Sequence, residues 1–209
     1  MCSGGDRLKD YSLGIPDADF IRGKVPMSKQ EVRILTLAKA RIKTKDNVID
    51  IGAGTGSLTI EAAFLANEGH VWAVEKNPEA IELLQENTKK FERDNITLLA
   101  GCAPEVMPPT DIFFDVVLIG GSGGKLVELF TIIDKQLQVG GRIVINAVTL
   151  ETLADCTNLM KKEFLTNYSC EVICVQVTRL NEAGTYNIFN ALNPVYIFSA
   201  RKIQNKKEF

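Results

Sequence analysis

Apolar residues follow two alternating patterns along this chain. Short continuous apolar runs predict buried strands, and longer stretches in which apolar residues return every three or four positions predict helices. The strands are expected at residues 47–51, 70–75, 95–101, 114–121 and 141–148. The helices are expected at residues 28–42, 56–67, 77–92, 122–137 and 149–164.

This strict alternation of strands and helices indicates right-handed crossovers and a parallel sheet with helices on both faces. The last two apolar runs, 169–180 and 193–202, have no helix between them, so we expect them to pair as a C-terminal antiparallel hairpin. The pattern therefore predicts an α/β, Rossmann-like fold with a seven-stranded, mostly parallel sheet. No repeat or linker divides the chain, so we expect a single domain over 1–209, with 1–25 as an N-terminal leader.

Two of the predicted helices begin with polar residues that are able to cap them. Ser28 lies three residues before Glu31, which is the spacing of a capping box. Asn77 and Pro78 suit the N-cap and the first helical position of a later helix. We therefore expect side-chain caps at both places.

The stretch DIGAGTGSLTIE, residues 50–61, places three glycines directly after the first predicted strand. Glycine is needed where the backbone takes a positive φ or where a ligand lies against the main chain. The spacing of Gly52, Gly54 and Gly56 is not the G-x-G-x-x-G of dinucleotide-binding folds. The lysine of a triphosphate-binding loop is also missing. The loop is therefore expected to bind a ligand without a phosphate.

An acidic residue, Glu75, ends the second predicted strand. A carboxylate at this place can accept hydrogen bonds from both hydroxyls of a ribose. Together, the glycine loop and the ribose-binding acid favour S-adenosylmethionine (SAM), an adenosine that carries a sulfonium and no phosphate. Asp50, before the loop, would supply negative charge beside the ammonium group of SAM.

Two further stretches are expected to contact SAM. Small residues follow the third strand, and the main chain of Ala103 would meet the edge of the adenine. The helix that starts at Ser28 offers free N–H groups to the carboxylate of the methionine part. The expected cofactor contacts are Ser28, Asp50, Gly52, Ala53, Gly54, Thr55, Gly56, Glu75 and Ala103.

The loop after the fourth predicted strand reads IGGSGG. Many enzymes that methylate exocyclic amines of bases carry Asn/Asp-Pro-Pro-Tyr here, and this chain does not. Its glycines leave space and expose main-chain N–H groups, which is typical of an anion-binding nest. We expect a large, carboxylate-rich substrate to bind at Gly120, Gly121, Ser122, Gly123 and Gly124.

Composition narrows the possible partners and compartments. The formal net charge of -2 gives no electrostatic footprint for nucleic acid. No apolar run approaches the roughly 20 residues of a membrane helix, and the N-terminus lacks a secretory signal. Five cysteines without a CxxC pair suggest reduced thiols in the cytoplasm. The single histidine, His70, is expected in a turn, and no metal site is expected.

Several longer stretches resemble one enzyme family. They are GIPDADFIRGKVPMSKQEVR, DIGAGTGSLTIEAA, AVEKNPEAIELLQENTKKF, GCAPE and IGGSGGKLVEL. Together they are similar to the decarboxylating precorrin (cobalt-precorrin) C15-methyltransferases of cobalamin biosynthesis, from about Gly14 to Arg201. The resemblance implies a SAM-dependent enzyme, in stand-alone form, that methylates C15 of precorrin-6B or cobalt-precorrin-6B and decarboxylates the C12 acetate. It also implies SAM contacts at Ser28, the loop 52–56, Glu75 and Ala103, and a homotetramer.

Such a reaction requires placement of the reacting groups in a water-poor pocket more than a reactive side chain, because the macrocycle can serve as its own electron sink. No catalytic side chain is therefore singled out. The candidate partners of the substrate carboxylates are Arg22, Lys24, Arg33, Lys125 and Arg179.

Four other functions stay open at this point, and one of them is another SAM-dependent methyltransferase that acts on a small molecule. A tRNA adenine-N1 methyltransferase has a related glycine loop, but the acidic balance of this chain argues against it. An NAD-binding oxidoreductase is disfavoured by the glycine spacing. A non-catalytic protein with a SAM-binding fold is the fourth alternative.

The stretch 177–192 is long for a hairpin connection, where roughly 2–5 residues are usual. It also carries five apolar side chains that a monomer would leave in water, namely Leu180, Tyr186, Ile188, Phe189 and Leu192. We therefore expect this stretch to build the subunit interface of a tetramer.

Overall fold

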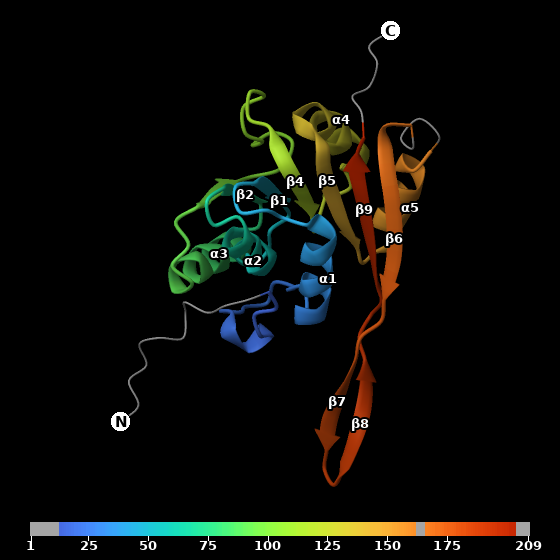
Figure 1. Cartoon of the computed structure of the whole chain (residues 1–209). Helices are drawn as coiled ribbons and strands as arrows, with labels where there is room; N and C mark the ends of the chain where they lie inside the picture. Colours follow the sequence, from blue (N-terminus) through green and yellow to red (C-terminus); the bar gives the residue numbers. More distant parts are fainter. Residues whose placement is uncertain (1–12, 162–165, 204–209) are drawn as a thin grey trace.

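A seven-stranded sheet runs through the centre of the molecule (Figure 1). The computed structural model describes residues 13–161 and 166–203, so the first part of the expected leader, with Cys2, and the end of the helix expected at 149–164 lie outside the described residues. The strand order is β3-β2-β1-β4-β5-β9-β6, and β9 runs opposite to the other six strands. The strands are β1 (Asn47–Ile51), β2 (His70–Glu75), β3 (Ile96–Ala100), β4 (Phe114–Ile119), β5 (Leu137–Ala147), β6 (Tyr168–Val175) and β9 (Val195–Lys202). The predicted fold class is confirmed, as is the antiparallel pairing of the last two long strands.

Helices cover both faces of this sheet (Figure 1). One face carries α1 (Gln30–Ala40), α2 (Ser57–Leu65) and α3 (Pro78–Lys90), and the other carries α4 (Leu126–Gln136) and α5 (Leu150–Leu159). Strands buried on both faces need apolar side chains at every position, which explains the continuous apolar runs in the sequence. Among the described residues, no helix has the length and apolar character needed to span a bilayer.

The two predicted helix caps have different outcomes. The side chain of Asn77 accepts hydrogen bonds from the main-chain N–H groups of Glu79 and Ala80, so the cap of α3 is confirmed. The capping box at Ser28 is wrong, because α1 begins at Gln30 with Lys29 at the N-cap and no side-chain cap. Glu31 is drawn away by Arg179, whose Nη2 donates to Glu31 Oε2 at 2.6 Å.

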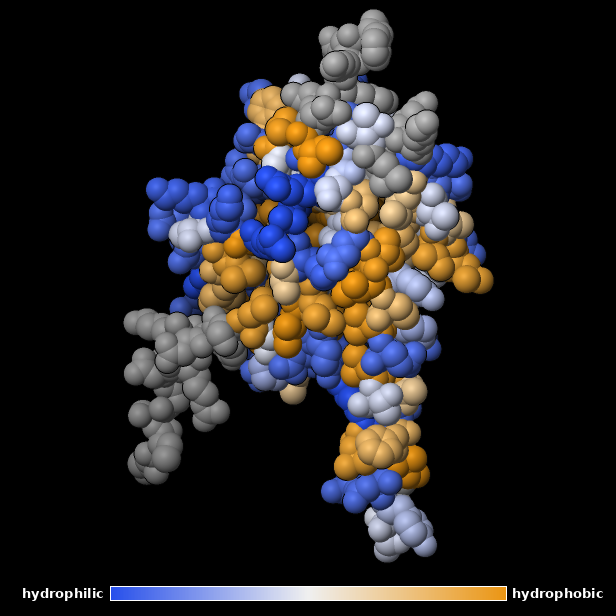
Figure 2. Space-filling view, turned by 45° about the vertical axis from the view of Figure 1, so that its right-hand side comes forward, coloured by the Kyte–Doolittle hydropathy of each residue, from blue (hydrophilic) through white to orange (hydrophobic). Residues whose placement is uncertain are grey.

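The predicted strand over 169–180 and the connection that follows it are also different in the structure. β6 ends at Val175, and the chain then forms a separate two-stranded hairpin of β7 (Thr178–Ala183) and β8 (Tyr186–Ala191). This hairpin extends away from the sheet (Figure 1), and Figure 2 shows apolar side chains along it. Leu180, Tyr186, Ile188 and Phe189 are all exposed there.

His70 is not a turn residue as expected but the first residue of β2. Its Nε2 lies 2.8 Å from the Thr97 hydroxyl oxygen, and its ring packs against Trp72 with the ring centroids 4.5 Å apart. Burial lowers the pKa of His70, because it disfavours the charged imidazolium. The contact of His70 with Thr97 therefore connects β2 to β3, the strand at the edge of the sheet.

A buried ion-pair network connects segments that are distant in the sequence. The side chain of Arg33 is fully buried, and it contacts Glu61 Oε1 and Asp17 Oδ1, each at 2.7 Å. Asp17 also accepts a hydrogen bond from Arg179 on β7, at 3.2 Å. Burial alone would raise the pKa of Asp17, but the hydrogen bonds and charges of Arg33 and Arg179 lower it. Arg33 was expected among the partners of a substrate, and this is wrong because its guanidinium is engaged inside the protein.

Replacing Arg33 tests how much this network stabilises the fold. Removing one partner of a buried ion pair leaves uncompensated charge, so Arg33→Ala should lower the free energy of unfolding by about 3–5 kcal/mol. Lys45→Ala is the control, because its pair with Glu68 is exposed and 3.7 Å long. It should cost no more than about 1 kcal/mol. Urea unfolding would measure both, and equal small losses would show that the network is not a stabilising element.

Candidate functional site

The carboxyl ends of β1, β2, β4 and β5 meet at one edge of the sheet, and two cavities open there. In open α/β sheets, ligands bind in the crevice outside this edge. The first cavity lies between the ends of β1 and β2, the loop after β3 and the loop after β4, and has a volume of about 210 Å³. The second lies at the start of α1 and has a volume of about 490 Å³. Gly52 lines both cavities.

The glycine loop between β1 and α2 takes a backbone conformation that favours glycine. Gly52, Gly54 and Gly56 have φ values of 75°, 57° and 79°. A Cβ built on Gly52 would lie 2.6–2.9 Å from three backbone atoms of Gly121, so no side chain fits there. The expectation that these glycines take positive φ is confirmed. At Gly52 the close main-chain neighbour is Gly121.

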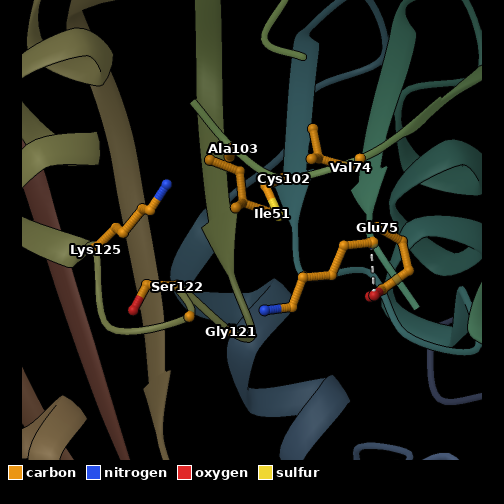
Figure 3. Close-up of a pocket in the computed structure, with 12 residues that line it drawn as sticks. Ile51, Val74, Glu75, Cys102, Ala103, Gly121, Ser122 and Lys125 are labelled. Carbon is orange, nitrogen blue, oxygen red and sulfur yellow. Dashed lines mark hydrogen bonds between the residues drawn. The ribbon is translucent and has the colours of Figure 1, made fainter. Parts of the chain in front are cut away.

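The carboxylate of Glu75 is fixed by main-chain donors at the end of β2. Its Oε2 accepts from Gly54 N, and its Oε1 accepts from Lys76 N and Asn77 N, all at 2.8 Å. Glu75 lines the first cavity, as Figure 3 shows. A carboxylate has about four acceptor sites, so these three hydrogen bonds leave Glu75 with about one site, on Oε2, for a hydroxyl of a ligand.

The other walls of the first cavity come from the loops after β3 and β4. Ala103 and Cys102 belong to the first of these loops, and Ser122 and Lys125 face Glu75 from the second (Figure 3). Ala103 is small and buried, which leaves room for a flat ring beside its main chain. The walls thus suit an adenosine, with an acceptor on one side and small residues on the other.

The loop over residues 120–124 was expected to form a substrate site of its own, but its residues are divided between the two cavities. Gly121, Ser122 and Gly123 line the first cavity together with Glu75, whereas Gly120 lines the second and Gly124 neither. Gly123 and Gly124 have φ values of 59° and 81°, which supports the expected need for glycine at these positions. The loop is therefore a wall shared by both cavities.

Asp50 lies at the second cavity and is buried. Its Oδ2 accepts a hydrogen bond from the Thr59 hydroxyl at 2.6 Å. Burial raises the pKa of Asp50 to about 6, and the nearby charge of Glu75 adds to this effect. A cation bound in the second cavity would favour the ionised form of Asp50.

The start of α1 forms another wall of the second cavity. Ser28 and Lys29 line it, together with Gly54 and Thr55 from the glycine loop. The first intrahelical bond runs from Arg33 N to Lys29 O, so the earlier N–H groups of α1 have no helical partner. Such groups suit a carboxylate. The expected site residues around the glycine loop therefore lie together in space.

The expected cationic partners of a substrate are mostly placed elsewhere. Arg22 and Lys24 are exposed and line neither cavity. Arg179 is held by Glu31 and Asp17. Lys125 lines the first cavity, and its Nζ lies 2.7 Å from Glu105 Oε1, an ion pair that raises the pKa of Lys125.

Two site residues were missed at the level of the sequence. Lys76 lines the first cavity, and a Cβ on Gly123 would lie 3.4 Å from its Nζ. Asn146 lines the second cavity. The signal for Asn146 was present, because it is a polar residue within the apolar run RIVINAV.

Comparison with known proteins gives consistent matches over most of the chain. Residues 19–202 match the model of the precorrin methyltransferase domain. A probable cobalt-precorrin-6B C(15)-methyltransferase (decarboxylating) of Sulfurisphaera tokodaii is 39% identical over 191 residues, which cover 90% of this chain and 97% of that protein.

Solved structures of similar sequence share the fold. A precorrin-6y C5,15-methyltransferase from Geobacter metallireducens superposes with a TM-score of 0.82 at 40% identity, covering 91% of this chain and 97% of that one. A precorrin 8W decarboxylase from Methanobacterium thermoautotrophicum gives a TM-score of 0.81 at 32% identity, covering 88% and 98%. The chain belongs to the precorrin methyltransferase family.

Proposed function

We propose that this protein is a cytoplasmic, SAM-dependent methyltransferase of cobalamin biosynthesis. It methylates C15 of precorrin-6B or cobalt-precorrin-6B and removes carbon dioxide from the C12 acetate. The observation that carries the proposal is the pair of cavities that meet at Gly52, in a chain whose family model covers residues 19–202. The name of the Sulfurisphaera relative supports the choice of reaction.

SAM would bind across Gly52, with its two ends in different cavities. Glu75 would accept hydrogen bonds from the ribose, and the main chain at Ala103 would contact the adenine. Asp50 and the start of α1 at Ser28 would hold the ammonium and carboxylate of the methionine part. The remaining contacts would come from the loop between them, at Gly52, Ala53, Gly54, Thr55 and Gly56. Bound SAM supplies an electrophilic methyl group.

The residues of the chain would mainly orient the substrate and exclude water. The loop of Gly120, Gly121, Ser122, Gly123 and Gly124 would bind it as the wall shared by both cavities. A macrocycle that accepts electrons into a protonated imine needs no further electron sink for decarboxylation, so desolvation of one acetate is the contribution required of the protein.

Turnover of defined substrates tests this function. Purified protein would be incubated with SAM and either the metal-free or the cobalt-containing precursor, and the products would be measured by mass spectrometry. We expect a product that has gained one methyl group and lost one carbon dioxide. Methylation of tRNA with neither precursor altered would instead favour the adenine-N1 methyltransferase alternative.

Removing Glu75 tests the cofactor site. Hydrogen bonds to a charged group are worth roughly 1.5–3 kcal/mol, so Glu75→Ala should weaken SAM binding by about 10- to 100-fold. Glu82→Ala, which removes an exposed carboxylate of α3, is the matched control and should bind SAM normally. Isothermal calorimetry would measure both affinities. Unchanged binding by Glu75→Ala would exclude this residue from the site.

The exposed hairpin supports a homotetramer as the assembly. Tyr186 and Phe189 on β8 are each 76% exposed, and Leu180 and Ile188 beside them are more than half exposed. Leu180 lies opposite Phe189 on one face of the hairpin, and Tyr186 and Ile188 lie on the other face. Exposed apolar surface of this kind is typical of protein interfaces, whose main energetic anchors are often aromatic. The hairpin would therefore pack against another copy of the chain.

Light scattering at micromolar concentration tests this assembly. We expect a tetramer for the wild-type protein and a lower mass for Phe189→Glu, because a buried unpaired carboxylate is costly. Val127→Glu places the same charge on an exposed apolar residue of α4 and should leave the mass unchanged. A monomeric wild-type protein would contradict the proposal.

A further inference from the structure

The second cavity is larger than the methionine part of SAM requires. Its inner end, at Asp50, Gly54 and Ser28, would hold the methionine. Its outer end lies between the end of β5 and the base of the hairpin, where it is lined by Asn146, Val148, Val177, Leu192, Asn193 and Val195. Nothing in the proposed binding of SAM uses this outer end.

Asn146 is the buried polar side chain of this outer end. It is only 6% exposed and lies at the end of β5, where its neighbours Ile145 and Ala147 are buried and apolar. Within the described part of the chain, one end of its amide contacts Thr36, and the other end makes no hydrogen bond. An amide end that opens to a cavity is completed by a ligand or by water.

The contact with Thr36 indicates which end of the amide faces the cavity. As placed in the structure, the Thr36 hydroxyl oxygen lies 2.7 Å from the Val32 carbonyl oxygen and 3.0 Å from Asn146 Oδ1. A hydroxyl has one hydrogen, so it cannot donate to both. The oxygen and nitrogen of an amide are assigned from their hydrogen bonds. The shorter contact, with Val32, takes that hydrogen. Turning the Asn146 amide by 180° then lets Nδ2 donate to the Thr36 hydroxyl oxygen, and Oδ1 faces the cavity.

Apolar surface continues outward from this amide. Val148, directly after the end of β5, lines this cavity and is 63% exposed. Val177 and Leu192 face the same cavity from the base of the hairpin. The outer end thus offers a hydrogen-bond acceptor inside and apolar walls around it, which suits the face of a flat ring system that carries N–H groups.

We propose that the outer end of the second cavity is the substrate compartment, and that Asn146 binds the macrocycle there by accepting a hydrogen bond from a ring N–H. This inference rests on the proposed function and names a binding residue for its substrate. It also places the substrate on the methionine side of Gly52 rather than beside Glu75. The methyl group would then reach the substrate from within one continuous cavity.

Two substitutions of Asn146 separate this role from the alternatives. Asn146→Leu keeps the size of the side chain and removes the acceptor, so the affinity for the precursor should fall about 10- to 100-fold. Asn146→Asp keeps an acceptor oxygen and should stay within about tenfold of the wild-type protein. Both variants should bind SAM normally, which also reports that they are folded. Asn158→Leu, on the exposed face of α5, is the matched control.

Calorimetric binding of SAM and of the metal-free precursor would be measured for each variant, with turnover as a separate readout. Equal precursor affinity of Asn146→Leu and the wild-type protein would overturn the proposal, and so would a loss of SAM binding in Asn146→Leu. If Asn146→Asp bound the precursor as weakly as Asn146→Leu, the assigned acceptor would be wrong. A wild-type protein that binds the precursor without converting it would contradict the proposed function instead.

Discussion

The close approach of two glycine loops at the edge of the sheet is the constraint on which the site depends. β1 and β4 are neighbours in register, and they end together at Ile51 and Ile119. Gly120 N and Gly121 N then donate to Ile51 O at 2.9 and 3.3 Å, which brings Gly121 against Gly52. Because a side chain at Gly52 would overlap the Gly121 backbone, glycine at this position is required by packing. The contact divides the crevice into two cavities that share one residue.

Glu75 links this contact to the rest of the fold. Its carboxylate accepts hydrogen bonds from the main-chain N–H groups of Gly54, Lys76 and Asn77. The glycine loop and the end of β2 therefore hold each other in place. On the other side, Asn87 of α3 donates to Thr55 O and exchanges hydrogen bonds with the main chain of Ile21. The leader segment therefore packs against the helix that follows Glu75. A reaction that depends on the placement of the reacting groups requires a site that is held rigidly in this way.

The predictions that the structure confirms rest on local signals. The strands, the glycine loop and the cap at Asn77 each follow from the residues in one short window. The features that were missed depend on partners far along the chain. Arg33 reads as an ordinary helical cation, and its burial follows only from Asp17 and Glu61, which the fold brings to it.

The hairpin and the second cavity were missed for the same reason. The sequence predicted β6 and the first residues of β7 as one strand, 169–180. In the structure, β6 leaves the sheet after the pair of Val175 with Val195. Asn146 was visible as a polar residue in an apolar strand. The role of Asn146 depends on its contact with Thr36 and on the cavity beside it, and neither can be predicted from the sequence of the strand.

A crystal structure with bound S-adenosylhomocysteine would test the central claim most directly. The account predicts one ligand that crosses Gly52, with its ribose hydroxyls on Glu75 and its amino-acid end near Asp50 and Ser28. The outer end of the second cavity, at Asn146, would stay open beside its sulfur. A ligand contained entirely in one of the two cavities, or one whose amino-acid end contacts Asn146, would contradict it.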